Sequence, residues 1–179
     1  RLQKSDGNGN FTISRNASVT TTDQPIGVID FASNTAHTVQ ARVMGKTRGT
    51  SNVGGDLVFE ARANGGSLDE RVRITGGGLL LIGRSSSRMV GGSTTYAKLQ
   101  VAGTSQSDSS ISIVNNENNA NGAFLFIGKT RGGSVNTSTI VQGGDTLGGL
   151  SFIGADSTDL NNRTAEITAV VNGSPTNNT

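Results

Sequence analysis

The pattern that most constrains the fold is a set of short runs in which apolar and polar residues alternate. These runs are bounded by clusters of Gly, Asn and Ser, and they include FTIS, GVIDF, DLVFEAR, ERVRIT, AKLQVA, SSISIV, GAFLFI and AEITAVV. Alternation with a period of two is typical of β-strands, and the flanking clusters favour tight turns. The best helical spacing, in SLDERVR, has no second turn before Gly76. The sequence therefore predicts an all-β chain.

Apolar residues are too few for an ordinary two-layer core. Counted without Gly, they make up 32% of the chain, aromatic residues make up 4%, and there is no Trp. The 26 Gly contribute no side chain to a core. Such chains share a core by stacking repeats or by winding together. We therefore expect repetitive short-strand modules with Gly- and Asn-rich turns, in an elongated, intertwined or stacked homotrimeric fibre. The candidates for the shared core are Val28, Phe31, Leu57, Phe59, Ile74, Leu150, Phe152 and Ile167.

The motif GKTRG occurs twice, at Gly45–Gly49 and at Gly128–Gly132. Its Gly-Lys-Thr also ends the nucleotide-binding P-loop, which needs an earlier glycine and a helix that begins at the lysine. Gln40 and Ala123 occupy the two positions where that glycine is required, and loop residues follow both copies. The motif therefore marks a structural repeat rather than a phosphate site.

The repeat continues beyond the motif. Each copy has GGD and then a short apolar strand, LVF or LSF, and the interval from Phe59 or Phe152 to the next Ile-Thr pair is the same. Length differences fall in the loops, as surface insertions do. A weaker echo relates IGVIDF to LGGLSF. We predict an N-terminal strand or linker at 1–23, a first repeat at 24–83, a connecting strand and polar loop at 84–122, and a second repeat at 123–179. We expect the second repeat to be truncated, as part of a longer protein.

Several functions are disfavoured by the sequence. The net charge of +2 provides no large cationic surface for nucleic acid. The longest apolar run, Leu79–Ile82, is too short to span a membrane. There is no Cys, and His37 is the only histidine, so we predict no metal set, no cofactor and no enzymatic activity. SDGNGN, at residues 5–10, is predicted to form a turn rather than a calcium loop.

Basic and acidic residues recur together in the two repeats. One interpretation is that the bases form ion pairs with the acids, within a chain or between chains; the other is that they contact an anionic receptor. We favour ion pairs, because the acids recur with the bases. Charge neutralisation is also expected among Asp69, Glu70, Arg71 and Arg73. The recurring candidates are Lys46, Arg48 and Asp56 in the first repeat, and Lys129, Arg131 and Asp145 in the second.

Three motifs in order resemble a module of bacteriophage tail-fibre proteins, especially those of marine and cyanobacterial phages. They are DERVRITGGGLLLIG at 69–83, YAKLQVAG at 96–103, and the second repeat that begins with FIGKTRG. The resemblance implies a trimeric, β-rich fibre on a virion, which reaches or binds the host surface. It also implies other tail proteins as partners, together with a glycan or protein of the bacterial surface.

Alternatives remain open. The polar stretch 104–122 hints at a receptor-binding domain, and a repeat adhesin of a bacterial surface would share the same physical properties. A polysaccharide depolymerase is less favoured, because it needs two carboxylates in a cleft and usually needs aromatic sugar platforms. Tyr96 is the only tyrosine, and there is no Trp.

Overall fold

The computed structural model describes residues 12–15, 20–33, 35–50, 54–92, 96–173 and 175–176. The described residues form β-strands, turns and a single 3-10 turn at Ser107–Ser109, so the all-β prediction is confirmed. SLDERVR, the best helical candidate, is mostly strand. The chain divides into two compact units. The first comprises Arg1–Arg88 and Tyr96–Ser110, and the second comprises Met89–Thr95 and Ile111–Thr179.

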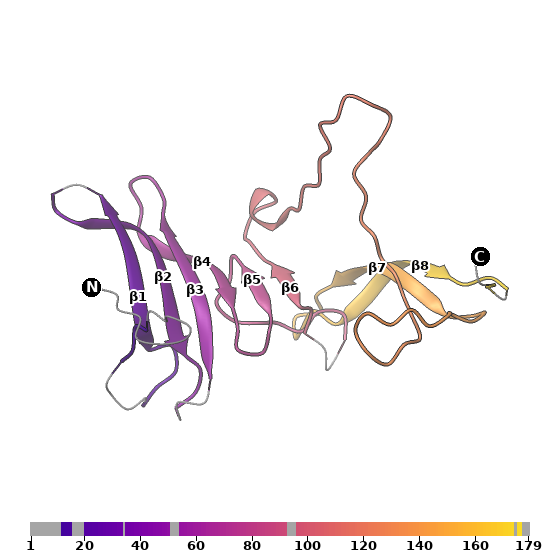
Figure 1. Cartoon of the computed structure of the whole chain (residues 1–179), viewed down its shortest axis with the longest axis horizontal. Helices are drawn as coiled ribbons and strands as arrows, with labels where there is room; N and C mark the ends of the chain where they lie inside the picture. Colours follow the sequence, from indigo (N-terminus) through magenta and orange to yellow (C-terminus); the bar gives the residue numbers. More distant parts are fainter. Residues whose placement is uncertain are drawn as a thin grey trace, which may run out of the picture. The chain divides into compact units, whose positions relative to one another are not determined.

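The first unit is a six-stranded sheet in which the strands follow one another in chain order (Figure 1). Neighbouring strands are antiparallel except for the last two, which are parallel. The strands are β1 (Pro25–Ser33), β2 (Thr38–Thr47), β3 (Gly55–Arg62), β4 (Leu68–Ile74), β5 (Leu80–Ile82) and β6 (Leu99–Val101).

The inner face of this sheet is covered by its own chain. It carries a row of residues that are paired across the strands, and Val58 and Leu81 in that row are fully buried. Asp23 contacts this face through Arg73, and the backbone N–H of Arg88 donates to Gln100. The row runs through Val28, Met44, Val58, Arg73, Leu81 and Gln100.

The opposite face, here called the open face, is apolar across all six strands. Because side chains alternate along a strand, the neighbours of the inner row point the other way. Two rows of paired residues cross the sheet on this side. One is Ile29, Val43, Phe59, Val72, Ile82 and Val101; the other is Gly27, Gly45, Leu57, Ile74, Leu80 and Leu99.

The second unit is built on a two-stranded antiparallel sheet of β7 (Thr146–Gly154) and β8 (Asn162–Val170). The face of this sheet that carries Leu150 and Phe152 on β7 and Ile167 on β8 is here called the open face of the second unit. A long arm, residues 111–127, leaves this unit as the loop at the top of Figure 1 and turns back at its tip, where the side-chain amide of Asn115 donates to the carbonyl of Asn121.

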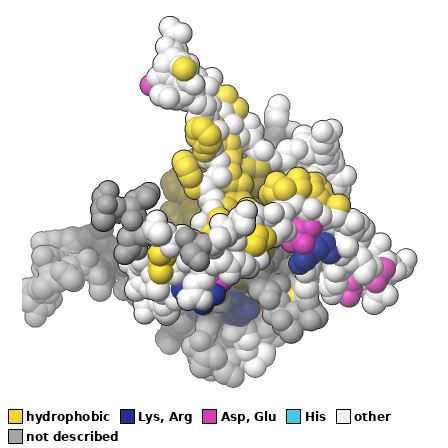
Figure 2. Space-filling view, turned by 90° about the vertical axis from the view of Figure 1, so that its right-hand side faces the viewer, with side chains coloured by type: hydrophobic (Ala, Val, Ile, Leu, Met, Phe, Trp, Pro, Cys, Tyr) yellow, Lys and Arg dark blue, Asp and Glu magenta, His cyan; other side chains and the backbone are white. Residues whose placement is uncertain are grey.

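Three predicted strands are wrong as strands of this chain's own sheets. In FTIS, the described residues Thr12–Ser14 lie outside any strand. Ser109–Val114 and Gly122–Ile127 alternate in sequence, but no residue from 103 to 145 lies in a strand. A strand is stabilised by backbone hydrogen bonds to a neighbour, and neither segment is paired with a strand of the two sheets. Their apolar side chains are exposed along the arm (Figure 2). Phe126 has 89% of its surface accessible.

The hairpins β1–β2 and β7–β8 have the same backbone plan. Eight residue pairs match one to one, and irregularities fall at corresponding places: after Pro25 and Thr146, and after Phe31 and Phe152. The hydrogen bonds that close them also match, and the residues at their entry, Asp23 (φ 60°) and Gly144 (φ 86°), both have positive φ. Hairpin β3–β4 has the same irregularity after Phe59.

Candidate functional site

The inner face of the first unit holds a buried charge cluster centred on Arg73, whose side chain is 4% exposed. Its guanidinium donates two bonds of 2.8 Å to Glu70 and one of 2.8 Å each to Asp23 and Asp56. Asp56 also accepts the backbone N–H of Gly76 at 2.8 Å. The bonds to Glu70, followed by those to the two aspartates, raise the pKa of Arg73. Because each charge is paired, we infer that the cluster is structural.

Lys46 and Arg48 lie at the edge of this cluster. Although Lys46 pairs with Asp56 in strand register, its Nζ lies 3.6 Å from Glu70 and 4.0 Å from Glu60. The Nη1 of Arg48 lies 4.0 Å from Asp56. Arg48 is half exposed and lines a cavity of about 380 Å³ together with the glycines Gly54, Gly76 and Gly77.

The second repeat forms its own ion pair. The guanidinium of Arg131 donates two bonds of 2.7 Å to Asp145, which also accepts the backbone N–H of Gln142 at 3.0 Å. The bonds from Arg131, and then that from Gln142, hold the pKa of Asp145 well below its usual range, and the charge of Lys129 acts in the same direction. Both recurring Arg–Asp pairs thus lie within one chain, although Arg48 and Asp56 are farther apart.

The core candidates separate into two groups. Val28 lies on the inner face and pairs with Met44. The other seven are at least about a third exposed in the single chain, from 36% for Phe59 to 63% for Ile167. These seven all lie on open faces: Phe31, Leu57, Phe59 and Ile74 in the first unit, and Leu150, Phe152 and Ile167 in the second.

Each open face has an apolar cavity beside a glycine. In the first unit the cavity has a volume of about 270 Å³, and Ile13 lies over Gly27. In the second unit it has a volume of about 250 Å³, and Ile127 lies over Gly148. These cavities are lined by hydrocarbon and by backbone, so they suit an apolar group.

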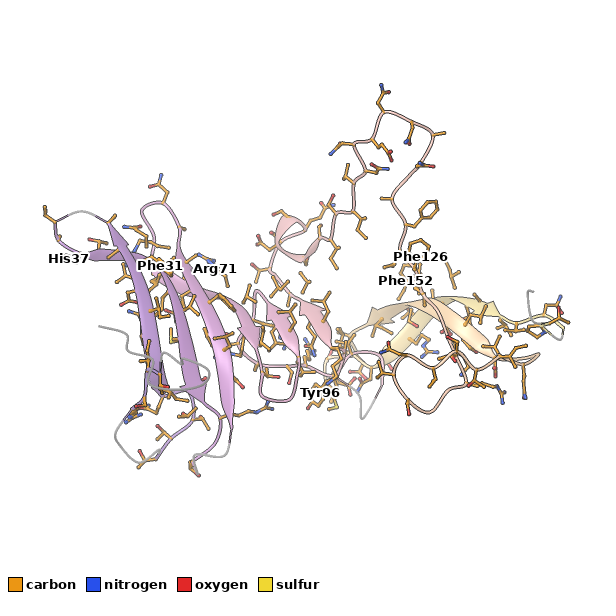
Figure 3. The ribbon with its side chains drawn as sticks, viewed as in Figure 1. Phe31, His37, Arg71, Tyr96, Phe126 and Phe152 are labelled. Atoms are coloured by element: carbon orange, nitrogen blue, oxygen red, sulfur yellow. The ribbon has the colours of Figure 1, made fainter. Side chains whose placement is uncertain are left out.

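The described residues provide no constellation for catalysis or metal binding that we can identify. No group of three or more His, Cys, Asp or Glu side chains able to hold a metal ion occurs among them. His37 is exposed in the turn between β1 and β2 (Figure 3). SDGNGN lies outside the described residues. Within the described part of the chain, no helix is long and apolar enough to cross a membrane.

Comparison with protein-family models, with curated proteins and with solved structures found no match to the chain.

Sequence reasoning missed two features of these sites. One is the contact of Asp23 with Arg73, which joins residues distant in sequence. The other is the pair of equivalent cavities, for which the only sequence signal was the similarity of IGVIDF to LGGLSF.

Proposed function

We propose that this chain is a non-enzymatic structural segment of a bacteriophage tail fibre, in which three copies share a core made by their open faces. The observation that carries the proposal is the asymmetry of the six-stranded sheet. Its inner face is covered by the chain itself, whereas its open face carries two unbroken rows of apolar or glycine residues. Soluble monomers rarely expose large contiguous apolar patches, and such patches mark interaction sites.

The energetics favour a shared core. Seven large apolar side chains of the first unit's open face are at least about a third exposed: Ile29, Phe31, Leu57, Phe59, Ile74, Leu80 and Leu99. Full burial of one such side chain contributes about 1.5–3 kcal/mol relative to full exposure. A face with this many partly exposed side chains therefore supplies a substantial driving force for association between copies.

The proposed role is mechanical. The segment separates an adhesive part of the fibre from the virion, and it resists unfolding because the copies hold one core in common. Three observations support it: the scarcity of apolar residues in the sequence, the ordered resemblance of its motifs to fibre modules, and the recurrence of one hairpin plan in both units.

A second candidate function is contact with an anionic glycan of the bacterial surface. Arg48 favours it, because this half-exposed side chain lines a cavity whose other walls are glycines. Unlike Arg131, Arg48 makes no bidentate bond to its aspartate, so its N–H groups remain better placed for a ligand.

A denaturing gel, run with and without boiling, tests the structural role. We expect the unboiled chain to migrate as three copies, and the boiled chain to migrate at 18.3 kDa. Fluorescently labelled protein should not bind to bacteria to which the whole fibre binds. Adhesion that is lost in Arg48→Glu would favour the glycan-binding function instead.

A further inference from the structure

The two apolar cavities are equivalent positions of a repeated unit. Under the hairpin match, five lining positions of one cavity correspond to five of the other, and an isoleucine outside each hairpin makes a sixth pair. In each unit an isoleucine from a preceding segment covers a glycine that has no room for a side chain: a Cβ on Gly27 would lie 2.7 Å from Ile13. The pairs are Ile13 and Ile127, Ile26 and Leu147, Gly27 and Gly148, Ile29 and Leu150, Val43 and Ile167, and Gly45 and Ala169.

A phenylalanine recurs at one fixed place beside these cavities. Phe31 and Phe152 each follow the cavity residue Ile29 or Leu150 by two positions, on the same face, directly before a strand irregularity. Their rings are among the largest apolar groups in the chain, yet Phe31 is 56% exposed and Phe152 is 52% exposed (Figure 3). Each unit thus presents an exposed aromatic ring and an apolar cavity.

We propose that Phe31 of one copy inserts into the first-unit cavity of a neighbouring copy, and that Phe152 inserts into the second-unit cavity in the same way. The inference rests on the proposed function and names the contact that holds the copies together. A preformed apolar cavity of about 150 Å³ binds benzene, so cavities of about 270 and 250 Å³ have room for a phenyl ring.

The recurrence identifies the occupant as a second copy of this chain. A phenylalanine directly before a strand irregularity and an apolar cavity occur together in both units, so a second copy provides the two rings in the same repeat. An unrelated partner would need a matching repeat of its own. A ring of one copy that enters a different surface of the next makes a heterologous contact, and three such contacts can close into a trimer.

Engineered disulfides test this contact, since the chain has no Cys. The variants are F31C/G45C for the first unit and F152C/A169C for the second. In one chain, Phe31 pairs with Ala41 and Phe152 pairs with Ala165, each four residues from the second position. At about 3.3 Å per residue this is about 13 Å, whereas the Cα atoms of a disulfide lie within about 7 Å. A disulfide therefore requires two copies.

We expect mild oxidation to convert both double variants into covalent dimers and trimers, which a non-reducing gel resolves. Each single variant should give more than tenfold less cross-linked product. The control F152C/T168C has its second cysteine on the opposite face and should not cross-link. Each variant keeps the ring of its other unit, and its mass is measured before oxidation. A double variant can also fall to the single-chain mass because it lacks the ring. This result supports the contact if G45C or A169C alone, which keeps the ring, retains the mass of three copies.

Two results would overturn the proposal, and they differ. If the double variants keep the mass of three copies but stay uncross-linked, the ring-and-cavity contact is wrong and the proposed function stands. If the unmodified chain has the mass of one copy, the proposed function fails and this contact fails with it.

Discussion

The hairpins β1–β2 and β7–β8 share their register, their irregularities and their closing hydrogen bonds, but their surroundings differ. Strand β2 pairs with β3 as well as with β1, whereas β8 pairs with β7 alone among the described strands. A two-stranded hairpin is at best marginally stable in water, and three or more strands with an apolar face are needed for independence. Local sequence is therefore sufficient to shape the hairpin, but not to stabilise it. The second unit should depend more on neighbouring copies than the first.

The largest predicted effect is the loss of stability of the first unit when its buried charge cluster is disrupted. Arg73→Ala leaves the carboxylates of Asp56 and Glu70 without their buried partner, which costs about 3–5 kcal/mol of unfolding free energy. Urea unfolding measures this change in the free energy of unfolding.

Arg71→Ala is the matched control for this variant. Arg71 is on the same strand and pairs with Asp69, but both side chains are 48% exposed, so the cost should be at most about 1 kcal/mol. Equal losses in the two variants would contradict the account of the buried cluster.

The next effect tests the second unit's dependence on the open face. Ile167→Asp places a charge where three copies are proposed to meet, and it removes a side chain whose burial contributes about 1.5–3 kcal/mol. We expect the mass to fall toward one chain at a higher protein concentration than in the unmodified chain, because only the first unit's open face is left intact. Thr168→Asp changes the adjacent residue on the opposite face and should leave the mass unchanged. If Ile167→Asp dissociates at the same protein concentration as the unmodified chain, the open face of the second unit lies outside the interface.

Hydrogen exchange compares the two hairpins directly. In dissociated Ile167→Asp protein, the amides of β7 and β8 should exchange at least about tenfold faster than those of β2 and β3, because local opening is cheaper in a two-stranded sheet. In the assembled protein this difference should narrow. Equal protection of the two hairpins in the dissociated chain would show that the second unit does not depend more on neighbouring copies than the first.

The smallest effect concerns pH. The Arg131 bond lowers the pKa of Asp145 in the folded chain below the value of about 3.9 that an unfolded aspartate has. The ion pair therefore stabilises the fold fully above about pH 4, and its contribution is lost as the pH falls through the folded pKa. The difference in urea midpoint between the natural chain and Arg131→Gln should be constant from pH 7 to pH 5 and should shrink at pH 3 and below. A difference that is undiminished at low pH would argue against this ion pair.

Alternation in the sequence was sufficient to predict the paired strands, including GVIDF in β1, DLVFEAR in β3 and AEITAVV in β8. The same signal failed for SSISIV and GAFLFI, because alternation describes one strand and does not specify a neighbour to bond with. The recurring Arg–Asp pairs were predictable, since both members repeat. The match of β1–β2 with β7–β8 was barely visible, because it is a property of the backbone: Gly27 and Phe31 recur as Gly148 and Phe152, while most partners differ.

The most direct test of the central claim is the solution mass of the unmodified chain, measured by light scattering across a dilution series. We expect three times 18.3 kDa, independent of concentration until dissociation begins. A well-folded particle of 18.3 kDa would contradict it. Such a result would show that the open faces do not form a shared core.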